Sequence, residues 1–293
     1  MDVAVVIPIW NRAALVSDTL DCVWKQTRAP RTVVVVDDGS TDGTPEVVEA
    51  WRDRVRPQFE FRLVRSDHGG AGAARNRGVE AAGTHDFLHF LDSDDLLPED
   101  FYARMATVLQ EDPGAGGASC DQTYFDSDGR ILRSRSLAGI ERDLLRWMLR
   151  NDGGILSVSC IRASVFEEFG PFDEATTSGA DAIFLASAAR EMRWLYVPGA
   201  AVRYRQTGDN LSRPTPEKSV LWAKRAEEFY RHPRIPHAER GHHLARRWRN
   251  AGNTARDAGD RLLARACYAN AIRKRWMFLR AHSKYLSTFL GRW

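Results

Sequence analysis

The chain has 293 residues, of which 43% are apolar and 28% are charged, and its 42 Lys and Arg residues slightly exceed its 39 Asp and Glu residues. One large domain or two of this total length can bury a full core without disulfide or metal support. The composition excludes a disordered or fibrous chain, and no apolar run reaches the roughly 18 residues of a membrane-spanning helix. The opening sequence MDVAVVIPIWNR has no basic segment before its apolar run, so it predicts a strand and not a signal peptide.

Cysteine and charge patterns bear on location and on domain organisation. The four cysteines, at positions 22, 120, 160 and 267, show no CxxC spacing, which predicts reduced thiols in a cytoplasmic protein.

Residues 215–293 hold 18 Lys and Arg against 6 Asp and Glu, a net charge of +12, whereas residues 1–214 have a net charge of −9. Because the turn signal Arg213-Pro214-Thr215-Pro216 stands at this change, we expect two domains, residues 1–214 and 215–293.

The N-terminal part of the chain alternates between two periodicities. Val- and Ile-rich runs predict strands, and the segments between them have apolar residues at helical spacing. The expected strands are residues 2–9, 32–36, 59–64 and 86–91, and the expected helices are residues 13–26, 44–51 and 71–82. This βαβα order is typical of a mainly parallel sheet with helices on its faces.

Farther along the chain the pattern changes. Strand signals are weak over residues 116–136, and later segments predict helices at 140–150 and 181–191 and short strands at 194–197 and 202–205. Beyond Pro216 the sequence predicts three or four basic amphipathic helices and no strand. We therefore expect an α/β domain followed by an all-helical extension.

Carboxylates follow two of the expected strands. Ligands bind beyond the carboxyl ends of parallel strands, and here Asp37-Asp38 follows the second strand and Asp92-Ser93-Asp94-Asp95 the fourth. Turn and capping chemistry accounts for the Ser40-Thr41-Asp42 segment, but not for adjacent carboxylates directly after a buried Val run. Such carboxylates repel each other unless a cation joins them, and Mg²⁺ or Mn²⁺ bound to a substrate diphosphate supplies one.

Four segments together resemble one known family. The segments VVIPIWNR, VVVVDDGSTDGT, GGAGAARNRG and FLDSDD, in this order and spacing, resemble the family 2 glycosyltransferases, and the resemblance covers roughly residues 1–210. It implies an α/β GT-A fold, Rossmann-like with a mainly parallel central sheet flanked by helices, to which residues 215–293 add a helical extension. It also implies an inverting enzyme that moves a sugar from a nucleotide diphosphate sugar, with UDP-sugars expected, to an acceptor.

The resemblance assigns the loop beside the nucleotide base. Pro8 and the Trp10-Asn11 pair match this loop, with Trp10 where the family usually has Tyr. Asp38 matches the residue that contacts the base, and Asp37 is expected to hold the loop. Sequence alone does not separate the roles of these two carboxylates.

A glycine-rich segment precedes the Arg75-Asn76 pair. By resemblance, Arg75 and Asn76 belong to a helix beside the nucleotide, and the Arg75 fork suits a phosphate or a base edge. The glycines of residues 69–72 also suggest a dinucleotide-binding loop. That fingerprint should follow the first strand, whereas this segment follows the third and lacks the last glycine, which disfavours a nicotinamide enzyme.

Asp92-Ser93-Asp94 matches the family's DxD motif. Asp94 is the expected ligand of Mn²⁺ or Mg²⁺, and Asp92, the second candidate ligand, is expected to face the ribose or a metal-bound water. Ser93 is assigned with them to the nucleotide-binding set. Asp95 has two alternatives, a role in the site or the N-cap of the following helix.

Direct displacement with inversion needs a general base for the acceptor hydroxyl. In the family this is usually the Asp of a Glu-Asp pair that follows a Gly-x-Phe-Asp-Glu stretch and starts a helix. Here that stretch is residues 170–174, so Asp181 is the expected base, and Ala180 stands where Glu is common. The alternatives are a purely helix-stabilising charge at Asp181 and Asp173 as the base.

The segment after the last expected strand departs from the family. Many members carry a His there that assists the metal or the diphosphate, whereas residues 206–212 contain none. Arg205 or Asn210 is the candidate substitute.

Two other classes compete with the transferase hypothesis. A binding or scaffold protein with a decayed transferase domain is disfavoured because the four key carboxylates are complete: Asp38, Asp92, Asp94 and Asp181. A nucleotidyltransferase would place a Gly-rich basic loop after the first strand, and residues 8–12 do not form one.

The basic C-terminal segment suggests several partners. It lacks a recognised nucleic-acid module, so no nucleic acid is expected. The apolar faces of residues 223–230 and 262–272 need a cover, for which the transferase domain or a second copy of the chain is nearest. The Arg-rich faces could hold an anionic acceptor or a membrane surface. The acceptor itself stays open among a glycan, a lipid-linked saccharide, a peptide and a natural product.

Overall fold

The computed structural model describes residues 1–151, 154–176, 179–206, 214–229, 231, 235, 237–275, 277 and 279–288. The chain forms two compact units. Residues Met1–Leu145 and Gly153–Gly208 make up the first, which we call the sheet unit, and Arg146–Asp152 with Asp209–Trp293 make up the second, the helical unit.

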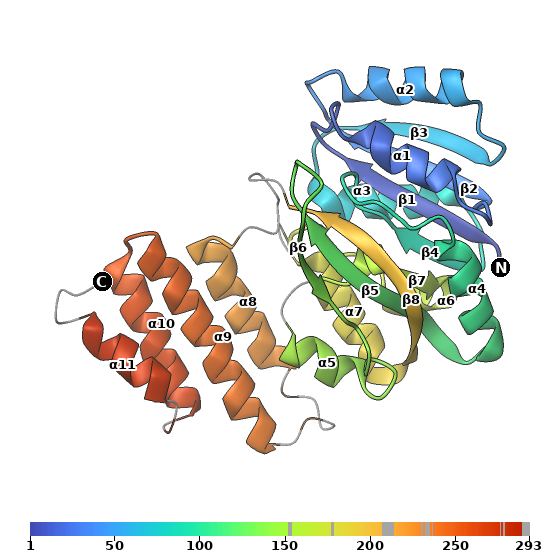
Figure 1. The fold of residues 1–293 in the computed structure, drawn as a ribbon. Helices are drawn as coiled ribbons and strands as arrows, with labels where there is room; N and C mark the ends of the chain where they lie inside the picture. Colours follow the sequence, from blue (N-terminus) through green and yellow to red (C-terminus); the bar gives the residue numbers. More distant parts are fainter. Residues whose placement is uncertain are drawn as a thin grey trace. The chain divides into compact units, whose positions relative to one another are not determined.

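One sheet organises the sheet unit (Figure 1). Its strands are β1 (Val3–Ile9), β2 (Thr32–Asp38), β3 (Glu60–Ser66), β4 (Phe87–Phe90), β5 (Ala115–Phe125), β6 (Ile131–Arg135), β7 (Ser159–Arg162) and β8 (Arg193–Arg205). The order is β3-β2-β1-β4-β7-β5-β6, with β8 paired to β5. Strands β1 to β4 pair in parallel, as does β8 with β5, whereas β7 runs antiparallel to β4 and β5. The predicted, mainly parallel sheet is confirmed.

Helices cover both faces of this sheet. They are α1 (Val16–Trp24), α2 (Thr44–Val55), α3 (Gly70–Ala82), α4 (Phe101–Glu111), α6 (Ala163–Phe169) and α7 (Ala180–Glu191), with a 3₁₀ turn at Leu156–Val158. Figure 1 shows α1 and α2 on one face and α3 behind the other. This follows from right-handed crossovers, because the chain steps outward from β1 to β3 and then returns past β1 to β4.

Burial explains why β1 and β2 form at the centre. Their Val and Ile side chains are almost completely buried, as expected for parallel strands covered on both faces. Helix α3 lies close above them because it carries Gly78, where an added Cβ would stand 2.2 Å from a methyl group of Val6. The close approach places Arg75 and Asn76 near the carboxyl ends of the strands.

The sheet beyond β4 was only partly predictable. Weak strand signals over residues 116–136 conceal the β5–β6 hairpin, β8 is one continuous strand where two short ones were expected, and β7 and α6 carried no clear signal. Gly117 shows the reason: an added Cβ would meet the Trp194 ring at 2.7 Å. Packing between distant segments, and not local periodicity, defines this part of the sheet.

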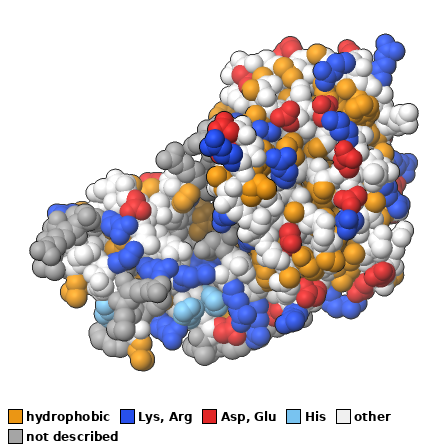
Figure 2. Space-filling model, viewed as in Figure 1, with side chains coloured by type: hydrophobic (Ala, Val, Ile, Leu, Met, Phe, Trp, Pro, Cys, Tyr) orange, Lys and Arg blue, Asp and Glu red, His pale blue; other side chains and the backbone are white. Residues whose placement is uncertain are grey.

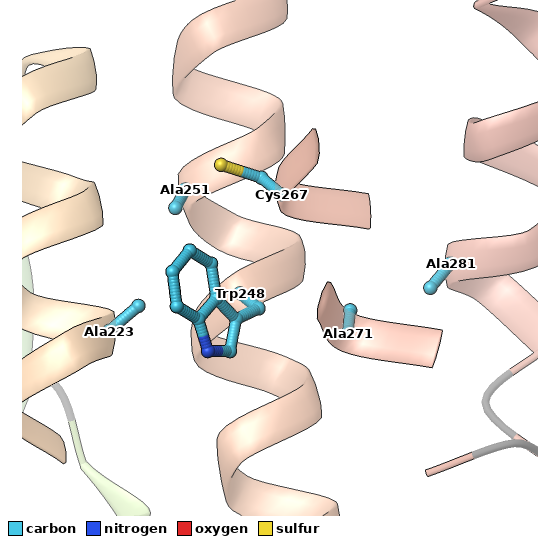
Figure 3. Close-up of a cluster of buried hydrophobic side chains, with 6 residues drawn as sticks. All are labelled: Ala223, Trp248, Ala251, Cys267, Ala271 and Ala281. Carbon is cyan, nitrogen blue, oxygen red and sulfur yellow. The ribbon is translucent and has the colours of Figure 1, made fainter. Parts of the chain in front are cut away.

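The helical unit contains four described helices of the basic segment, α8 (Pro216–Phe229), α9 (His237–Asp257), α10 (Arg261–Lys274) and α11 (Leu279–Ser287), together with most of α5 (Leu144–Arg150). Small side chains and one indole form its core (Figure 3): Ala223, Trp248, Ala251, Cys267, Ala271 and Ala281. Helix α9 thus packs on Ala223 of α8 and on Cys267 and Ala271 of α10 within the same unit. Packing within the unit therefore covers part of the apolar faces of α8 and α10, Leu262 of α10 stays exposed, and a contact with a second copy of the chain stays a prediction.

Lys and Arg side chains gather on the helical unit, as Figure 2 shows. The four cysteines of the chain are all free thiols. In the part of the chain that the structure describes, no helix combines the length and the apolar character needed to cross a bilayer.

Candidate active site

The predicted polar residues gather at the carboxyl ends of β1, β2 and β4. The ends of β1 and β2 are joined by hydrogen bonds of Asn11, whose amide oxygen accepts from the Thr41 N–H at 2.8 Å and whose N–H donates to Ser40 Oγ at 2.9 Å. Asn11 has a positive φ of 52°, a conformation that Asn tolerates better than most residues. Pro8 lies within β1, paired with Val36.

Trp10 offers an exposed aromatic surface beside this loop. Its side chain is 41% exposed, and its ring stacks on His68 with centroids 4.7 Å apart. A ring held in this way can stack with a planar base on a free face. The substitution of Trp for the usual Tyr is therefore compatible with the predicted role, and His68 is a site residue that the sequence did not single out.

The two carboxylates that end β2 have different partners. Asp38 accepts from the N–H groups of Gly69 and Gly70, both at 2.8 Å, and its Oδ2 lies 2.9 Å from His68 Nδ1. Asp37 accepts from the N–H of Ser40 at 3.3 Å. Both carboxylates therefore stabilise loops here, and the contact of Asp38 with a base stays a prediction.

Asn76 holds a distant loop. Its amide nitrogen donates to the Phe172 carbonyl at 2.9 Å and to Glu174 Oε1 at 2.8 Å, and its amide oxygen accepts from the Phe172 N–H at 2.9 Å. Every polar atom of the Asn76 side chain thus has a protein partner. The structure places Asn76 as a positioning residue for the Gly-x-Phe-Asp-Glu loop.

Arg75, its neighbour, points into the site. Arg75 Nη2 donates to Asp92 Oδ1 at 2.8 Å, and its guanidinium group lies 5.8 Å from the centre of the Phe172 ring. Arg75 therefore connects the glycine-rich helix with the DxD motif. Its predicted position beside a diphosphate stays a prediction.

The DxD motif follows β4 as expected. Asp92 is half-buried, and its N–H donates to Ser157 Oγ at 3.3 Å. Asp94 is buried, 3.7 Å from Arg12 Nε. Burial raises the pKa of Asp94 to about 6, with Asp92 adding to the shift and Arg12 opposing it. Ser93 is buried between them.

Asp95 does not cap a helix. The next helix, α4, begins at Phe101 with Asp100 as its N-cap residue, so the capping alternative was wrong. Asp95 is fully buried, and its Oδ1 accepts from the Arg205 N–H at 3.4 Å. Burial, together with Asp92 and Asp94, raises its pKa well above the ordinary value. Asp95 therefore ties the motif to β8.

Asp181 stands in the first turn of α7, near the DxD motif. Burial raises the pKa of Asp181, with Arg75 opposing the shift and Asp92 adding to it. Gly154 lies against the carboxylate, because an added Cβ there would be 2.7 Å from Asp181 Oδ2. A carboxylate with a raised pKa is a stronger proton acceptor, which suits a general base.

The absence of Glu at position 180 has a packing explanation. Ala180 is buried, and an added Cβ at Gly72 of α3 would stand 3.6 Å from the Ala180 Cβ. A longer side chain would meet α3 there. The rival base Asp173 is engaged in a turn, where it accepts from the Ala175 N–H at 3.0 Å and from the Thr176 hydroxyl.

Arg205, a candidate for the diphosphate, is held within the protein. Its Nη2 donates to Asp18 Oδ2 at 2.9 Å and its Nε to the Asp94 carbonyl at 3.3 Å. Arg205 thus supports the backbone of the DxD motif. Asn210, the other candidate, lies outside the described residues.

Arg12 and Ser157 are site residues that sequence reasoning missed. Arg12 could have been found, because it follows Asn11 directly at the end of the first strand. Ser157 has no local signal: the 3₁₀ turn places its hydroxyl beside the Asp92 backbone.

The carboxylates fit a divalent cation shared with a substrate. Among the described residues, no three His, Cys, Asp or Glu side chains gather into a site that would hold a metal by themselves. Asp92 and Asp94 offer hard oxygen donors, and burial together with the neighbouring Asp92 charge raises the pKa of Asp94. Two carboxylates completed by diphosphate oxygens are the donor set that Mg²⁺ and Mn²⁺ favour.

Comparison with known structures identifies the fold. S. aureus TarS 1-349, solved with UDP-GlcNAc, superposes with a TM-score of 0.71 at 19% identity, covering 99% of this chain and 89% of that chain. The mannosyltransferase PcManGT from Pyrobaculum calidifontis, solved with GDP-Man and Mn²⁺, has a TM-score of 0.57 at 22% identity, covering 99% and 86%. The fold is the predicted GT-A fold with C-terminal helices.

Sequence comparison then identifies the family. Residues 4–169 match the model of Glycosyl transferase family 2, and the chain belongs to that family. It is 30% identical over 132 residues to the glycosyltransferase GlyG of Streptococcus pneumoniae, covering 44% of this chain and 42% of GlyG. It is 44% identical over 93 residues to validoxylamine A glucosyltransferase of Streptomyces hygroscopicus subsp. limoneus, covering 31% and 20%. The chain therefore spans less than half the length of these relatives.

Proposed function

We propose that this protein is an inverting glycosyltransferase that moves a sugar from a nucleotide diphosphate sugar to an acceptor nucleophile. One observation carries the proposal: Arg75 donates to Asp92 of the DxD motif, and the charges of Arg75 and Asp92 both act on the pKa of the buried Asp181. In this arrangement the DxD carboxylates and Arg75 would bind a diphosphate, and Asp181 would accept a proton from the sugar acceptor. Structures with UDP-GlcNAc and with GDP-Man share the fold, and we propose a UDP-sugar as donor.

The donor half of the site would bind the leaving group. The base would stack beside Trp10, and Arg75 would face the diphosphate with its planar fork of donors. Asp94, with Asp92 as second candidate ligand, would hold Mn²⁺ or Mg²⁺, which when bound neutralises charge on the departing diphosphate.

The part of the site that would bind the sugar acceptor would supply the general base. Asp181 takes the proton of the acceptor hydroxyl as its oxygen bonds to the anomeric carbon, while the bond from that carbon to the diphosphate oxygen breaks. Attack opposite the leaving group inverts the anomeric configuration. Burial of Asp181 favours this step, since it raises the carboxylate's affinity for a proton.

We assign donor chemistry to residues 1–214 and a supporting role to the basic residues 215–293. The +12 charge of that segment would attract an anionic acceptor or surface. We propose a cytoplasmic location, which the four free thiols support.

The test is a donor screen followed by a variant pair. Nucleotide sugars are incubated with Mn²⁺ or Mg²⁺, and sugar release or transfer is measured. Asp181→Asn keeps the shape but removes the proton acceptor, so turnover should fall by roughly 10² to 10⁴, with donor affinity within a few-fold. The matched control is Asp173→Asn, whose carboxylate serves a turn. Full activity of Asp181→Asn, with loss in Asp173→Asn, would reassign the base.

A further inference from the structure

The His68 imidazole is held by two neighbours beside the end of β2. Its ring stacks on Trp10, with centroids 4.7 Å apart and an angle of 30° between the planes. Its Nδ1 lies 2.9 Å from Asp38 Oδ2. Because an ionised carboxylate only accepts hydrogen bonds, Nδ1 carries a proton and donates it. His68 thus presents a planar ring to Trp10 and an N–H group to Asp38.

A nucleotide base would need the same two contacts. In the proposed function the base stacks beside Trp10 and is contacted by Asp38, and uracil is itself a planar ring whose N3–H group is a hydrogen-bond donor. The imidazole and the base would therefore compete for one indole ring and one carboxylate. This comparison rests on the proposed function, because the roles of Trp10 and Asp38 in base binding come from the family resemblance.

The Asp38 carboxylate leaves little room for a base while His68 is in place. Asp38 Oδ1 accepts from the Gly69 N–H and Oδ2 from the Gly70 N–H, both at 2.8 Å. Only 4% of the Asp38 side chain is exposed. Two of these three donors are backbone groups where α3 begins, and the third is the His68 side chain. A base would therefore reach Asp38 by displacing the imidazole.

The His68 side chain can move while its backbone stays in place. The side chain is 54% exposed, so rotation about its Cα–Cβ bond would carry the ring into solvent. The backbone is packed on the turn after β2, because an added Cβ at Gly39 would stand 3.1 Å from the His68 backbone nitrogen. The ring would lose its stacking and its hydrogen bond, and the base would make both again.

We infer that His68 is an internal competitor of the nucleotide base. Its imidazole occupies the place on Trp10 and Asp38 that the base would take, and it rotates away when the donor binds. His68 therefore lowers the affinity for every donor. It also determines specificity, because a base without an N–H group facing Asp38 would not replace the hydrogen bond that the imidazole gives up.

The experiment is calorimetric titration of the full chain with UDP and Mn²⁺, for the wild type and for His68→Ala. If the imidazole occupies the site in about nine molecules of ten, its removal should raise the affinity for UDP roughly tenfold. The affinity for inorganic pyrophosphate with Mn²⁺ should stay within about twofold, because pyrophosphate has no base. UDP methylated at N3, which lacks the donor for Asp38, should gain less than UDP. Since His68 is exposed, the variant should fold, which circular dichroism checks.

The matched control is His242→Ala, the same substitution at an exposed histidine of the helical unit, which should bind UDP like the wild type. Unchanged or lower UDP affinity in His68→Ala would overturn the inference, because a ring that supports the base would have that effect. An equal gain for pyrophosphate or for the methylated UDP would overturn it as well. These results would leave the proposed function standing. If neither the wild type nor His68→Ala bound UDP, the proposed UDP-sugar donor would be refuted, and the inference with it.

Discussion

Asn76 shows how a residue's partners decide its role. Its position in the Arg-Asn pair predicts a nucleotide contact, whereas in the structure its amide group is hydrogen-bonded to Phe172 and Glu174. The residue connects α3 with the loop that leads to α7. Its effect on the reaction would then pass through the placement of Asp181.

Replacement of Asn76 should separate positioning from nucleotide binding. Asn76→Ala leaves the polar backbone groups of Phe172 without their partner, and each such buried group costs about 1–3 kcal/mol. We expect lower stability in urea and a lower turnover number, with the affinity for UDP changed by less than a few-fold. Calorimetric titration of UDP is the measurement. A large loss of UDP affinity at unchanged stability would instead support the direct contact.

His89 gives the fold a pH dependence. It is fully buried between the Ser157 carbonyl at 2.9 Å from Nε2 and Tyr102 Oη at 2.8 Å from Nδ1. The carbonyl can only accept, so Nε2 carries the proton and Nδ1 accepts from the tyrosine. Burial lowers the pKa of His89 from 6.5 to about 4.

A lowered pKa makes stability fall as the pH decreases. Between pH 6.5 and about pH 4, His89 is protonated in the unfolded chain but neutral in the folded chain. The free energy of unfolding therefore decreases as the pH falls through this range. At about 1.4 kcal/mol per pH unit, His89 should remove about 2 kcal/mol between pH 7 and pH 5. Urea unfolding of wild type and His89→Gln at both pH values is the measurement. The variant should lose less stability than the wild type over this range, and parallel losses would contradict the prediction.

At the scale of elements, the packing of α3 on the sheet depends on a glycine, Gly78. Gly78 allows the helix to approach Val6 and Val36 of the two central strands. Gly78→Ala should cost about 1–3 kcal/mol, the usual range for overpacking, and should weaken UDP binding because Arg75 moves with the helix. Glu80→Ala on the exposed side of α3 is the control and should change neither quantity. Unchanged stability and UDP affinity in Gly78→Ala would contradict this prediction, because the helix could then shift without a loss of free energy.

At the scale of the whole molecule, donor binding should raise thermal stability. A ligand at about 100 times its dissociation constant adds about 2.7 kcal/mol. We expect UDP with Mn²⁺ to raise the Tm by several degrees and EDTA to remove most of that shift. GDP with Mn²⁺ serves as the comparison. An equal shift in EDTA would contradict a metal-bridged diphosphate.

Asp94→Asn tests the metal dependence of UDP binding by changing a ligand residue instead of removing the metal. Because the pKa of Asp94 is raised to about 6, the contribution of this group to stability is full below about pH 4 and lost as the pH rises through 6. Without metal, the variant should therefore be at least as stable as the wild type at pH 7. With UDP and Mn²⁺ it should show no metal-dependent shift. A metal-free variant that is less stable at pH 7 would contradict the assignment of burial as the main cause.

The sequence alone determined the order of strands and helices in the N-terminal part, the family and the carboxylates at the strand ends. It could do so because side-chain periodicity and chemical type are local properties, readable within one segment. The tertiary structure decided the partners. In the folded protein, Asn76 is hydrogen-bonded to Phe172, Asp95 to the backbone of β8, and Arg205 to Asp18. Helix α9 packs against α8 and α10. The tertiary structure also formed β7 and the β5–β6 hairpin from weakly patterned segments. These outcomes depend on residues far apart in the chain, whose contacts exist only once packing has brought them together.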